Sequence, residues 1–342
     1  MARKTFRKVI TSKELIEKIN PKNKKLINSF LKDKNRKCSD ATIKNYTSDL
    51  NIFFCWVVDN ADNKAFPDIK KIELSEFFSF CMDELKWSGK RFARMRSTLS
   101  SLSETIIKYY DEEYPTFRNI INSTIEAISK SPVRKKTVLE DDEVLGLLNW
   151  LTEKELYADA CLFALALYSG GRISELEQFT INTIDVDRIA FDGFLLETTH
   201  EIRTKGEGKI GKMMKKFVIK DLFLPYYNKY LEQRVEIVEK TKTDSDALFL
   251  QKDGKPTSVN TFNSWIKKWE RFLEKDLYFH CFRHYFVTKL TKLDMSDEII
   301  ISIVGWSSAE MKKIYTDIED KDKDWSKDLN KLSAFLTEVA GD

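Results

Sequence analysis

The sequence has no long hydrophobic run. Hydrophobic residues make up 42% of its 342 residues, but no stretch of 18 or more apolar residues occurs. A membrane-spanning helix needs about 20 such residues in succession, so we expect no membrane span. The basic segment 1–19 also lacks the apolar core of a signal peptide. We therefore expect a cytoplasmic protein, and the length is typical of two domains.

The sequence also lacks a pattern of paired cysteines. Its five cysteines are an odd number, they are widely spaced, and most of them lie within apolar runs. This pattern is typical of reduced, packed thiols in a cytosolic protein rather than of disulfides or a zinc site. The five are Cys38, Cys55, Cys81, Cys161 and Cys281.

Histidine is scarce, with only His200, His280 and His284 in the whole chain. His280 and His284 are four residues apart, which is a spacing that can hold a metal ion on a helix. However, no glutamate stands where the helical metalloprotease motif requires one, and the cation Arg283 adjoins His284. We therefore predict no metal site and no cofactor, and a structural role for His284.

Charge is nearly balanced overall but unevenly distributed. The formal net charge is +3, yet residues 1–40 hold thirteen Lys or Arg against four Asp or Glu. Residues 203–220 hold seven basic residues and one acidic residue, Glu207. Local basic excess is typical of a nucleic-acid-binding protein. The alternative is that these lysines only form solvated, exposed helix faces.

Hydrophobic periodicity divides the chain into a helical part and a mixed part. From Asp40 apolar residues recur at helical spacing, and further helical stretches follow, which predicts an all-α module of about four short helices. After the helix that starts at Asp40, the further predicted helices cover residues 74–86, 90–110 and 117–129. Segment 131–137 has a proline and no apolar period, so we read it as a linker.

Beyond the linker the pattern predicts helices around a small sheet. Residues 157–168 predict a helix that is buried on all sides and ends at Gly170 and Gly171. Strands are expected at 189–196 and 216–219, with segment 199–203 and a turn rich in glycine and lysine between them. Further helices are expected at 225–240, 258–275 and 296–304. The fold class is therefore mostly α, with a small antiparallel β-sheet in the second domain.

One constellation of residues points to phosphate chemistry. His280 and Arg283 are three residues apart, so on a helix they share a face. Arg172 follows the glycine pair far upstream. Two guanidinium groups and an imidazole suit an oxygen-rich anion such as a phosphate. Together with Tyr315 near the end of the chain, they suggest phosphoryl transfer to a tyrosyl nucleophile.

The three segments that carry these residues are GGRISEL, HCFRHYFVTKL and VGWSSAEMKKIY. In this order and spacing, the sequence resembles the tyrosine recombinase, or phage integrase, family. The resemblance implies a two-domain, C-shaped clamp around DNA. Its parts would be a basic N-terminal segment (1–22), a helical core-binding domain (23–130), the linker (131–137), a catalytic domain (138–315) and a tail (316–342). The tail would pack into a neighbouring subunit or onto its own domain.

The resemblance also implies a role for each site residue. Tyr315 would attack the phosphorus and form a 3′-phosphotyrosyl intermediate that needs neither metal nor ATP, while Arg172 and Arg283 hold the phosphate. His280 would donate to the phosphate or accept the tyrosyl proton, and Trp306 would donate its indole N–H. The remaining roles are a general acid, Lys205, with Lys209 and Lys212 as alternatives in the same turn, and a supporting carboxylate, Glu175.

The expected partner is a double-stranded DNA recombination site. The resemblance implies a homotetramer on two duplexes, a monomer without DNA, and accessory DNA-bending proteins as further partners. Basic residues of the helical domain are the candidate phosphate contacts, with simple solubilisation of a helix as the alternative. They are Lys86, Lys90, Arg91, Arg94 and Arg96, and Lys209 and Lys212 of the turn are expected to contact DNA as well.

Two other functions share part of this pattern. A type IB topoisomerase-like enzyme, which nicks and closes DNA, has the same constellation of residues. A DNA-binding regulator that has lost catalysis would lack one of the catalytic residues, and none is missing here. The leading hypothesis is a site-specific recombinase of a phage or another mobile element.

Overall fold

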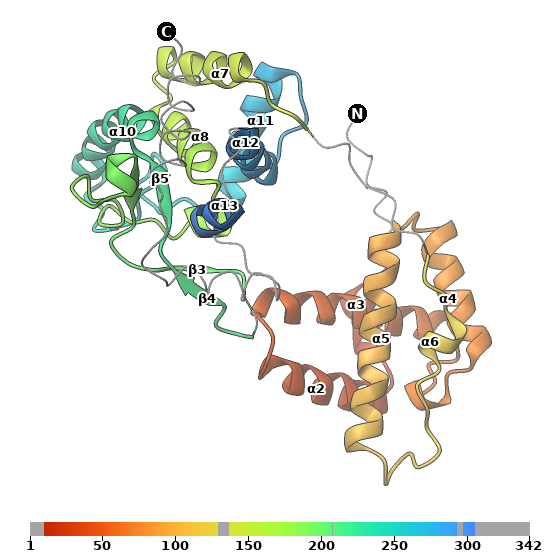
Figure 1. Ribbon diagram of the computed structural model, residues 1–342. Helices are drawn as coiled ribbons and strands as arrows, with labels where there is room; N and C mark the ends of the chain where they lie inside the picture. The colour runs from red at the N-terminus through yellow and green to blue at the C-terminus, as the bar shows by residue number, and fades with distance from the viewer. Residues whose placement is uncertain (1–9, 129–136, 207, 293–296, 305–342) are drawn as a thin grey trace. The chain divides into compact units, whose positions relative to one another are not determined.

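The computed structural model describes residues 10–128, 137–206, 208–292 and 297–304 (Figure 1). Packing contacts divide the chain into two compact units, one of residues 1–135 and 207–210 and the other of residues 136–206 and 211–342. We call them the helical unit and the mixed unit. The predicted linker lies almost entirely in residues 129–136, outside the described residues.

The helical unit is all-α. Its helices are α1 (Lys13–Lys18), α2 (Pro21–Asn35), α3 (Asp40–Asn60), α4 (Lys71–Asp83), α5 (Gly89–Tyr109) and α6 (Ile121–Thr124), with a 3-10 turn η1 (Phe66–Asp68). The core is rich in aromatic rings packed edge to face. The ring centroids of Phe53 and Phe77 lie 4.9 Å apart, and those of Trp56 and Phe77 lie 5.5 Å apart. Such pairs stabilise a core beyond the area that they bury.

Two parts of the helical unit differ from the prediction. Helix α2 forms among the lysines near the N-terminus because Leu26, Ile27 and Phe30 bury one face of it, while its lysines lie outside. The predicted helix at 117–129 is only the single turn α6. There the side chain of Asn119 accepts from the backbone N–H of Ile121, and such local bonds compete with a longer helix.

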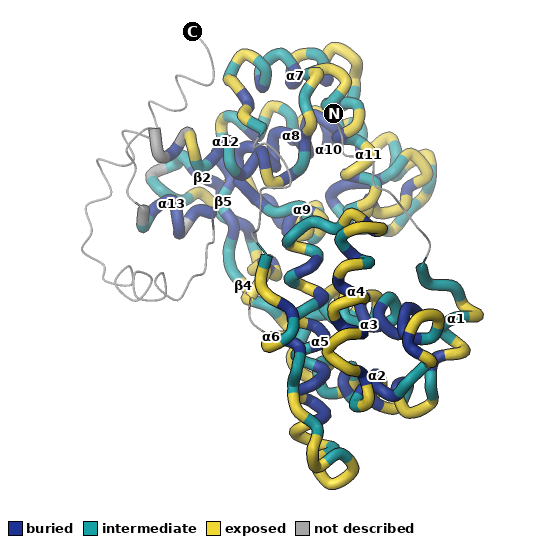
Figure 2. The backbone as a smooth tube through the Cα atoms, turned by 90° about the vertical axis from the view of Figure 1, so that its right-hand side faces the viewer, coloured by how far each residue is buried: buried dark blue, intermediate teal, exposed yellow. Residues whose placement is uncertain are grey.

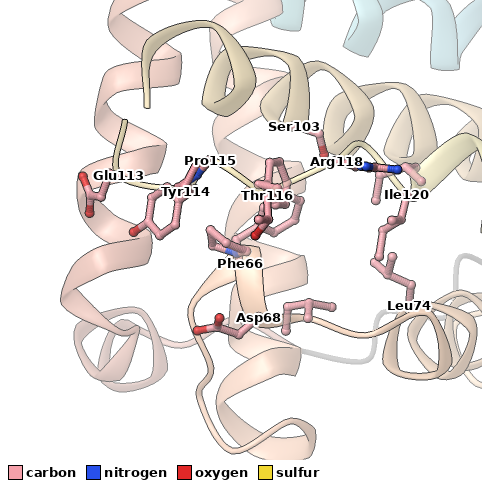
Figure 3. A pocket seen from close by; sticks show the side chains of 14 residues that line it. Phe66, Asp68, Leu74, Ser103, Glu113, Tyr114, Pro115, Thr116, Arg118 and Ile120 are labelled. Atoms are coloured by element: carbon pink, nitrogen blue, oxygen red, sulfur yellow. The ribbon is translucent and has the colours of Figure 1, made fainter. Parts of the chain in front are cut away.

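The loop that follows α5 lies over η1 and lines a partly open cavity of about 420 Å³. Figure 3 shows Phe66 of η1 facing Tyr114 and Pro115 of this loop, with Leu74 of α4 at the far end. Burial raises the pKa of Tyr114 to about 12, with the neighbouring Glu113 as a second cause. Tyr114 therefore stays protonated at neutral pH and lines the cavity as a neutral phenol.

The mixed unit is built around one buried helix. Helix α8 (Tyr157–Ser169) is buried at every position from Asp159 to Ser169, as predicted (Figure 2). It packs against α7 (Asp141–Glu153), α10 (Lys220–Thr241) and α12 (Phe279–Lys292). The other helices of this unit are α9 (Ile173–Leu176), α11 (Val259–Leu273) and α13 (Asp297–Val304).

The strands form two small antiparallel sheets, so the predicted fold class, mostly α with little β, is confirmed. One sheet has the order β1 (Ile189–Ala190), β2 (Leu195–Glu197) and β5 (Phe217–Ile219); the other is the hairpin β3 (Ile202–Thr204) and β4 (Lys212–Met214). The strand predicted at 189–196 is interrupted by the 3-10 turn η2 (Phe191–Gly193), where Phe191 and Gly193 have positive φ.

Helix α10 begins earlier than the prediction, which placed its start at Pro225. It starts at Lys220, directly after β5, and Pro225 lies inside it. A proline in the second turn removes only one helical hydrogen bond, and the continuous chain from β5 fixes where the helix starts. No helix in the part of the chain that the structure describes is long and apolar enough to cross a membrane.

Candidate active site

The glycine pair after α8 sets the position of Arg172. Gly170 ends α8 in the left-handed conformation, with φ +56°. A Cβ at Gly170 would lie 2.7 Å from the ring of Phe286 on α12, and one at Gly171 would lie 2.6 Å from Leu176. Glycine is the residue that allows both the conformation and the close approach. The chain therefore turns at once into α9, and Arg172 becomes the residue that precedes it.

Glu175 holds Arg172 from two sides. Its Oε2 accepts from the backbone N–H of Arg172 at 3.0 Å, and its Oε1 accepts from Nη1 of the same arginine at 2.7 Å. The side chain of Glu175 is 1% exposed and that of Arg172 is 28% exposed. The guanidinium thus lies at the surface of the unit, with the carboxylate buried beneath it.

Lys216 completes this cluster and was not among the site residues predicted from the sequence. It precedes β5, its side chain is 3% exposed, and its Nζ lies 2.9 Å from Oε2 of Glu175. The available signal was its alternation with Val218 on the buried face of a strand. A lysine at such a position needs a buried anion, because an unpaired buried charge is very costly.

The pKa values of the pair follow from this geometry. Burial raises the pKa of Glu175, but the charge of Lys216 and the hydrogen bonds from Arg172 outweigh it, so this pKa lies below its ordinary value. Burial lowers the pKa of Lys216, Glu175 raises it, and Arg283 and Arg172 lower it, so the net shift is downward. Arg172, Arg283 and Lys216 therefore lie within electrostatic reach of one another.

Arg283 joins three segments of the unit. From α12 its Nη1 donates to the carbonyl oxygen of Gly170 at 2.8 Å, and its Nη2 donates to that of Val304 at 3.0 Å. It is 2% exposed, and burial, with Arg172 as the second cause, lowers its pKa to about 10. It remains charged at neutral pH. The structure thus brings Arg172, Glu175 and Arg283, all selected from the sequence, into one cluster.

His280 is the second residue of α12 and is exposed. Its ring centroid lies 4.4 Å from that of the half-buried His284, at an interplanar angle of 72°. No group of three or more potential metal ligands occurs among the described residues. His280 thus presents its imidazole to solvent on the helix that also carries Arg283.

The hairpin that carries Lys205 is attached to the segment after α9. Gln178 donates to the carbonyl oxygen of Arg203 at 2.9 Å and accepts from the N–H of Arg203 at 3.0 Å. Lys205 directly follows β3, and Lys205, Lys209 and Lys212 are all exposed. Gln178 was not predicted from the sequence, because a glutamine in a loop gives no signal until its partner strand is known.

The basic residues proposed for DNA contact in the helical unit have different environments. Arg94 forms hydrogen bonds of 3.0 Å to both carboxylate oxygens of the fully buried Asp49, and Arg91 pairs with the same carboxylate. Arg96 donates to the carbonyl oxygen of Ile125 at 2.7 Å. Lys86 and Lys90 are exposed. The arginines therefore contribute to the packing of α5, and the two lysines face solvent.

Trp306 and Tyr315 lie outside the described residues, as does the tail 316–342. The structure thus shows Arg172 before α9, His280 and Arg283 on α12, and Lys205 after β3, all in the mixed unit. Such an arrangement can bind an oxyanion between guanidinium groups and supply a proton from a lysine.

Comparison with known families decides what kind of protein this is. Residues 137–322, more than half of the chain, match the Phage integrase family. The chain belongs to the phage integrase family. The protein is a tyrosine-type site-specific recombinase, as the sequence analysis expected.

Curated relatives of this recombinase support the assignment. A tyrosine recombinase of Thermosipho africanus is 23% identical, with 84% of this chain and 92% of that protein covered. Tyrosine recombinase XerD of Staphylococcus epidermidis is 26% identical over 82% of this chain and 88% of its own. An SPbeta prophage-derived recombinase-like protein of Bacillus subtilis is 27% identical over 64% of each chain.

Solved structures show the same fold. A lambda integrase dimer bound to a COC' core site superposes with a TM-score of 0.60 at 18% identity, covering 92% of this recombinase and 83% of that chain. The Tn1549 transposon integrase in complex with circular intermediate DNA gives a TM-score of 0.60 at 18% identity, covering 85% and 94%. These likenesses concern the fold.

Proposed function

We propose that this recombinase cuts and rejoins double-stranded DNA at a specific site through a covalent 3′-phosphotyrosyl intermediate formed by Tyr315. The observation that carries the proposal is the bond from Arg283 to the carbonyl oxygen of Gly170. It brings Arg283 to the turn that presents Arg172. Two guanidinium groups from distant segments thereby lie within electrostatic reach of one another, and such groups stabilise the charge that develops in a phosphoryl-transfer transition state.

Each remaining group has a task in this reaction. The two arginines hold the non-bridging oxygens, where negative charge develops. His280 donates to the phosphate or takes the phenol proton, because an imidazole suits either role near neutral pH. Trp306 can donate only, through its indole N–H. Glu175 acts behind Arg172 and positions it.

Lys205 is the proposed general acid. The 5′ oxygen that leaves must gain a proton, and Lys205 stands at the start of an exposed turn fastened next to α9. Lys209 and Lys212 are the alternatives in the same turn. The phosphotyrosyl bond keeps the energy of the phosphodiester, so rejoining by the same groups requires neither ATP nor a metal ion.

The proposed assembly is a homotetramer on two duplexes that forms from monomers on DNA. A lambda integrase tetramer bound to a Holliday junction shares the fold, with a TM-score of 0.59 at 17% identity, which supports this expectation. We further propose a role in a phage or another mobile element, in keeping with the prophage-derived and transposon relatives. The helical unit would bind DNA through Lys86 and Lys90, and accessory DNA-bending proteins are further candidate partners.

The test of this function is formation of a covalent adduct. The full chain is incubated with candidate sites that carry a nick near the cleavage point, and protein–DNA adducts that resist SDS are separated on a gel. Wild type should form the adduct without metal or ATP, and Tyr315→Phe should not. Adduct formation by Tyr315→Phe would show that another residue is the nucleophile. Relaxation of a plasmid without any specific site would instead favour the topoisomerase-like function.

A further inference from the structure

We propose that Lys216 is a positioning residue that neutralises Glu175, so that the charge of Arg172 and Arg283 stays available to the scissile phosphate. The inference rests on the proposed function and adds to its site a residue that would never touch DNA.

The side chains of this cluster follow one another from the surface inward. Arg172 is partly exposed, while Glu175 and Lys216 beneath it are 1% and 3% exposed. Oε1 of Glu175 accepts from the guanidinium, while Oε2 receives the backbone N–H of Arg172 and the ammonium of Lys216. Lys216 therefore acts on the arginine through the carboxylate, because the carboxylate lies between the two cations.

The net charge of the cluster also depends on Lys216. Arg172 and Glu175 alone sum to zero, and a buried carboxylate beside a phosphate would repel it. With Lys216 and Arg283 the cluster has three cations and one carboxylate, a net charge of +2. Charge counts for much more in a site shielded from water than on an open surface. Lys216 thus allows Glu175 to orient Arg172 without cancelling its charge.

Lys216 and Glu175 depend on each other for their charged states. Burial and the two arginines lower the pKa of Lys216, and among the described residues Glu175 raises it. Lys216 in turn lowers the pKa of Glu175. Removing Glu175 takes from the buried Lys216 its anionic partner, and removing Lys216 leaves Glu175 paired with Arg172, whose charge it then cancels. Removing both leaves neither buried charge. This dependence predicts a specific pattern in a double-mutant cycle.

The experiment compares Lys216→Met, Glu175→Gln and the double variant in the full chain. The rate of adduct formation is measured in a single turnover on the nicked substrate, with DNA affinity and unfolding by urea measured separately. We expect Lys216→Met to be slower by about tenfold or more. Adding Glu175→Gln to Lys216→Met should raise the rate to within about threefold of Glu175→Gln alone.

Lys215→Met is the matched control. It removes a positive charge one residue away, from a side chain that bonds only the carbonyl oxygens of Thr198 and Thr199 in the described part of the chain. Its rate should stay within about twofold of wild type. A Lys216→Met enzyme that folds and cleaves like wild type would overturn the proposal. So would a double variant as slow as Lys216→Met, because packing alone would then explain the loss.

Two further measurements keep the test decisive. If the single variant Lys216→Met does not fold, the effect of Lys216→Met on the rate of adduct formation is measured in the Glu175→Gln background. An additional loss of about tenfold there would overturn the proposal, because Lys216 would then act independently of Glu175. If wild type forms no adduct on any site, the proposed function fails. The role of Lys216 is then tested by measuring the affinity for inorganic phosphate by calorimetry. That affinity should fall about fivefold in Lys216→Met and recover in the double variant; equal affinities would overturn it.

Discussion

Arg283 and Gly170 are joined by a buried hydrogen bond of 2.8 Å from the guanidinium to the carbonyl oxygen. Gly170 caps the C-terminus of α8, and the second acceptor, Val304, is the last residue of α13. Helix C-termini carry partial negative charge and exposed carbonyl groups. Arg283 is thus held by two helix ends, and its position is part of the packing of the unit.

The two arginines should therefore differ in their effect on stability. Arg283→Ala removes the guanidinium donor from two buried carbonyl groups, and we expect the free energy of unfolding to fall by about 2–4 kcal/mol. Arg172→Ala affects a partly exposed ion pair, and about 1 kcal/mol or less is expected. Both should abolish adduct formation. Urea unfolding and the nicked substrate measure the two effects, and equal stabilities would contradict this account.

Gly170 should not tolerate a side chain. Gly170→Ala places a Cβ in a left-handed residue and against Phe286. The conformation alone costs about 1–2 kcal/mol, and the contact adds to it. Gly146→Ala is the matched control, because it lies within α7 with nothing within 4 Å of the added Cβ. It should raise the free energy of unfolding by about 0.5–1 kcal/mol. A neutral Gly170→Ala would refute the packing argument.

Stability at low pH should depend on Glu175. Its pKa in the folded protein lies below the ordinary value, because Lys216 and Arg172 outweigh the effect of burial. The folded state then binds fewer protons than the unfolded state, whose glutamate has a pKa of about 4.3. This stabilisation is present above that pH and is lost as the pH falls through the folded pKa. Wild type should therefore lose more unfolding free energy than Glu175→Gln below about pH 4; parallel curves would contradict the shift.

Lys205 should be dispensable when the leaving group needs no proton. Lys205→Ala should cleave the ordinary nicked substrate at least about 100-fold more slowly than wild type. On a substrate with sulfur at the 5′ bridging position it should recover nearly full activity, because a thiolate leaves without an acid. Adduct formation on both substrates is the measurement. Persistent failure on the sulfur substrate would move the assignment to Lys209 or Lys212.

Substitutions at Lys90 and Arg94 should affect DNA binding and stability separately. Lys90→Ala should weaken binding to any duplex and reduce the salt dependence of the binding constant by about one unit in the log–log slope, without a change in stability. Arg94→Ala should lower the free energy of unfolding, because it leaves the buried Asp49 with fewer partners. Anisotropy titrations at several salt concentrations and urea unfolding test the pair. A stable Arg94→Ala with a smaller salt slope would reverse the two roles.

Local sequence was sufficient for much of this protein. The apolar run of α8 predicted a helix buried on all sides, because no face of it carries enough polar groups to meet water. The glycine pair predicted the turn after it, and the spacing of His280 and Arg283 placed them on one helix. The three motifs predicted the family, since their residue types and order are set by the chemistry of one reaction.

Only the tertiary structure revealed Lys216, Gln178 and the pairing of Arg91 and Arg94 with Asp49. Each depends on a partner far along the chain, and a lysine or arginine in a sequence looks the same whether it faces solvent or a buried carboxylate. Helix α2 and the early start of α10 were not predicted from the sequence either, because burial against neighbouring elements outweighs local propensity. The sequence by itself determined which chemical groups the recombinase has, and packing decided which of them lie together, because burial and charge pairing arise only when distant segments meet.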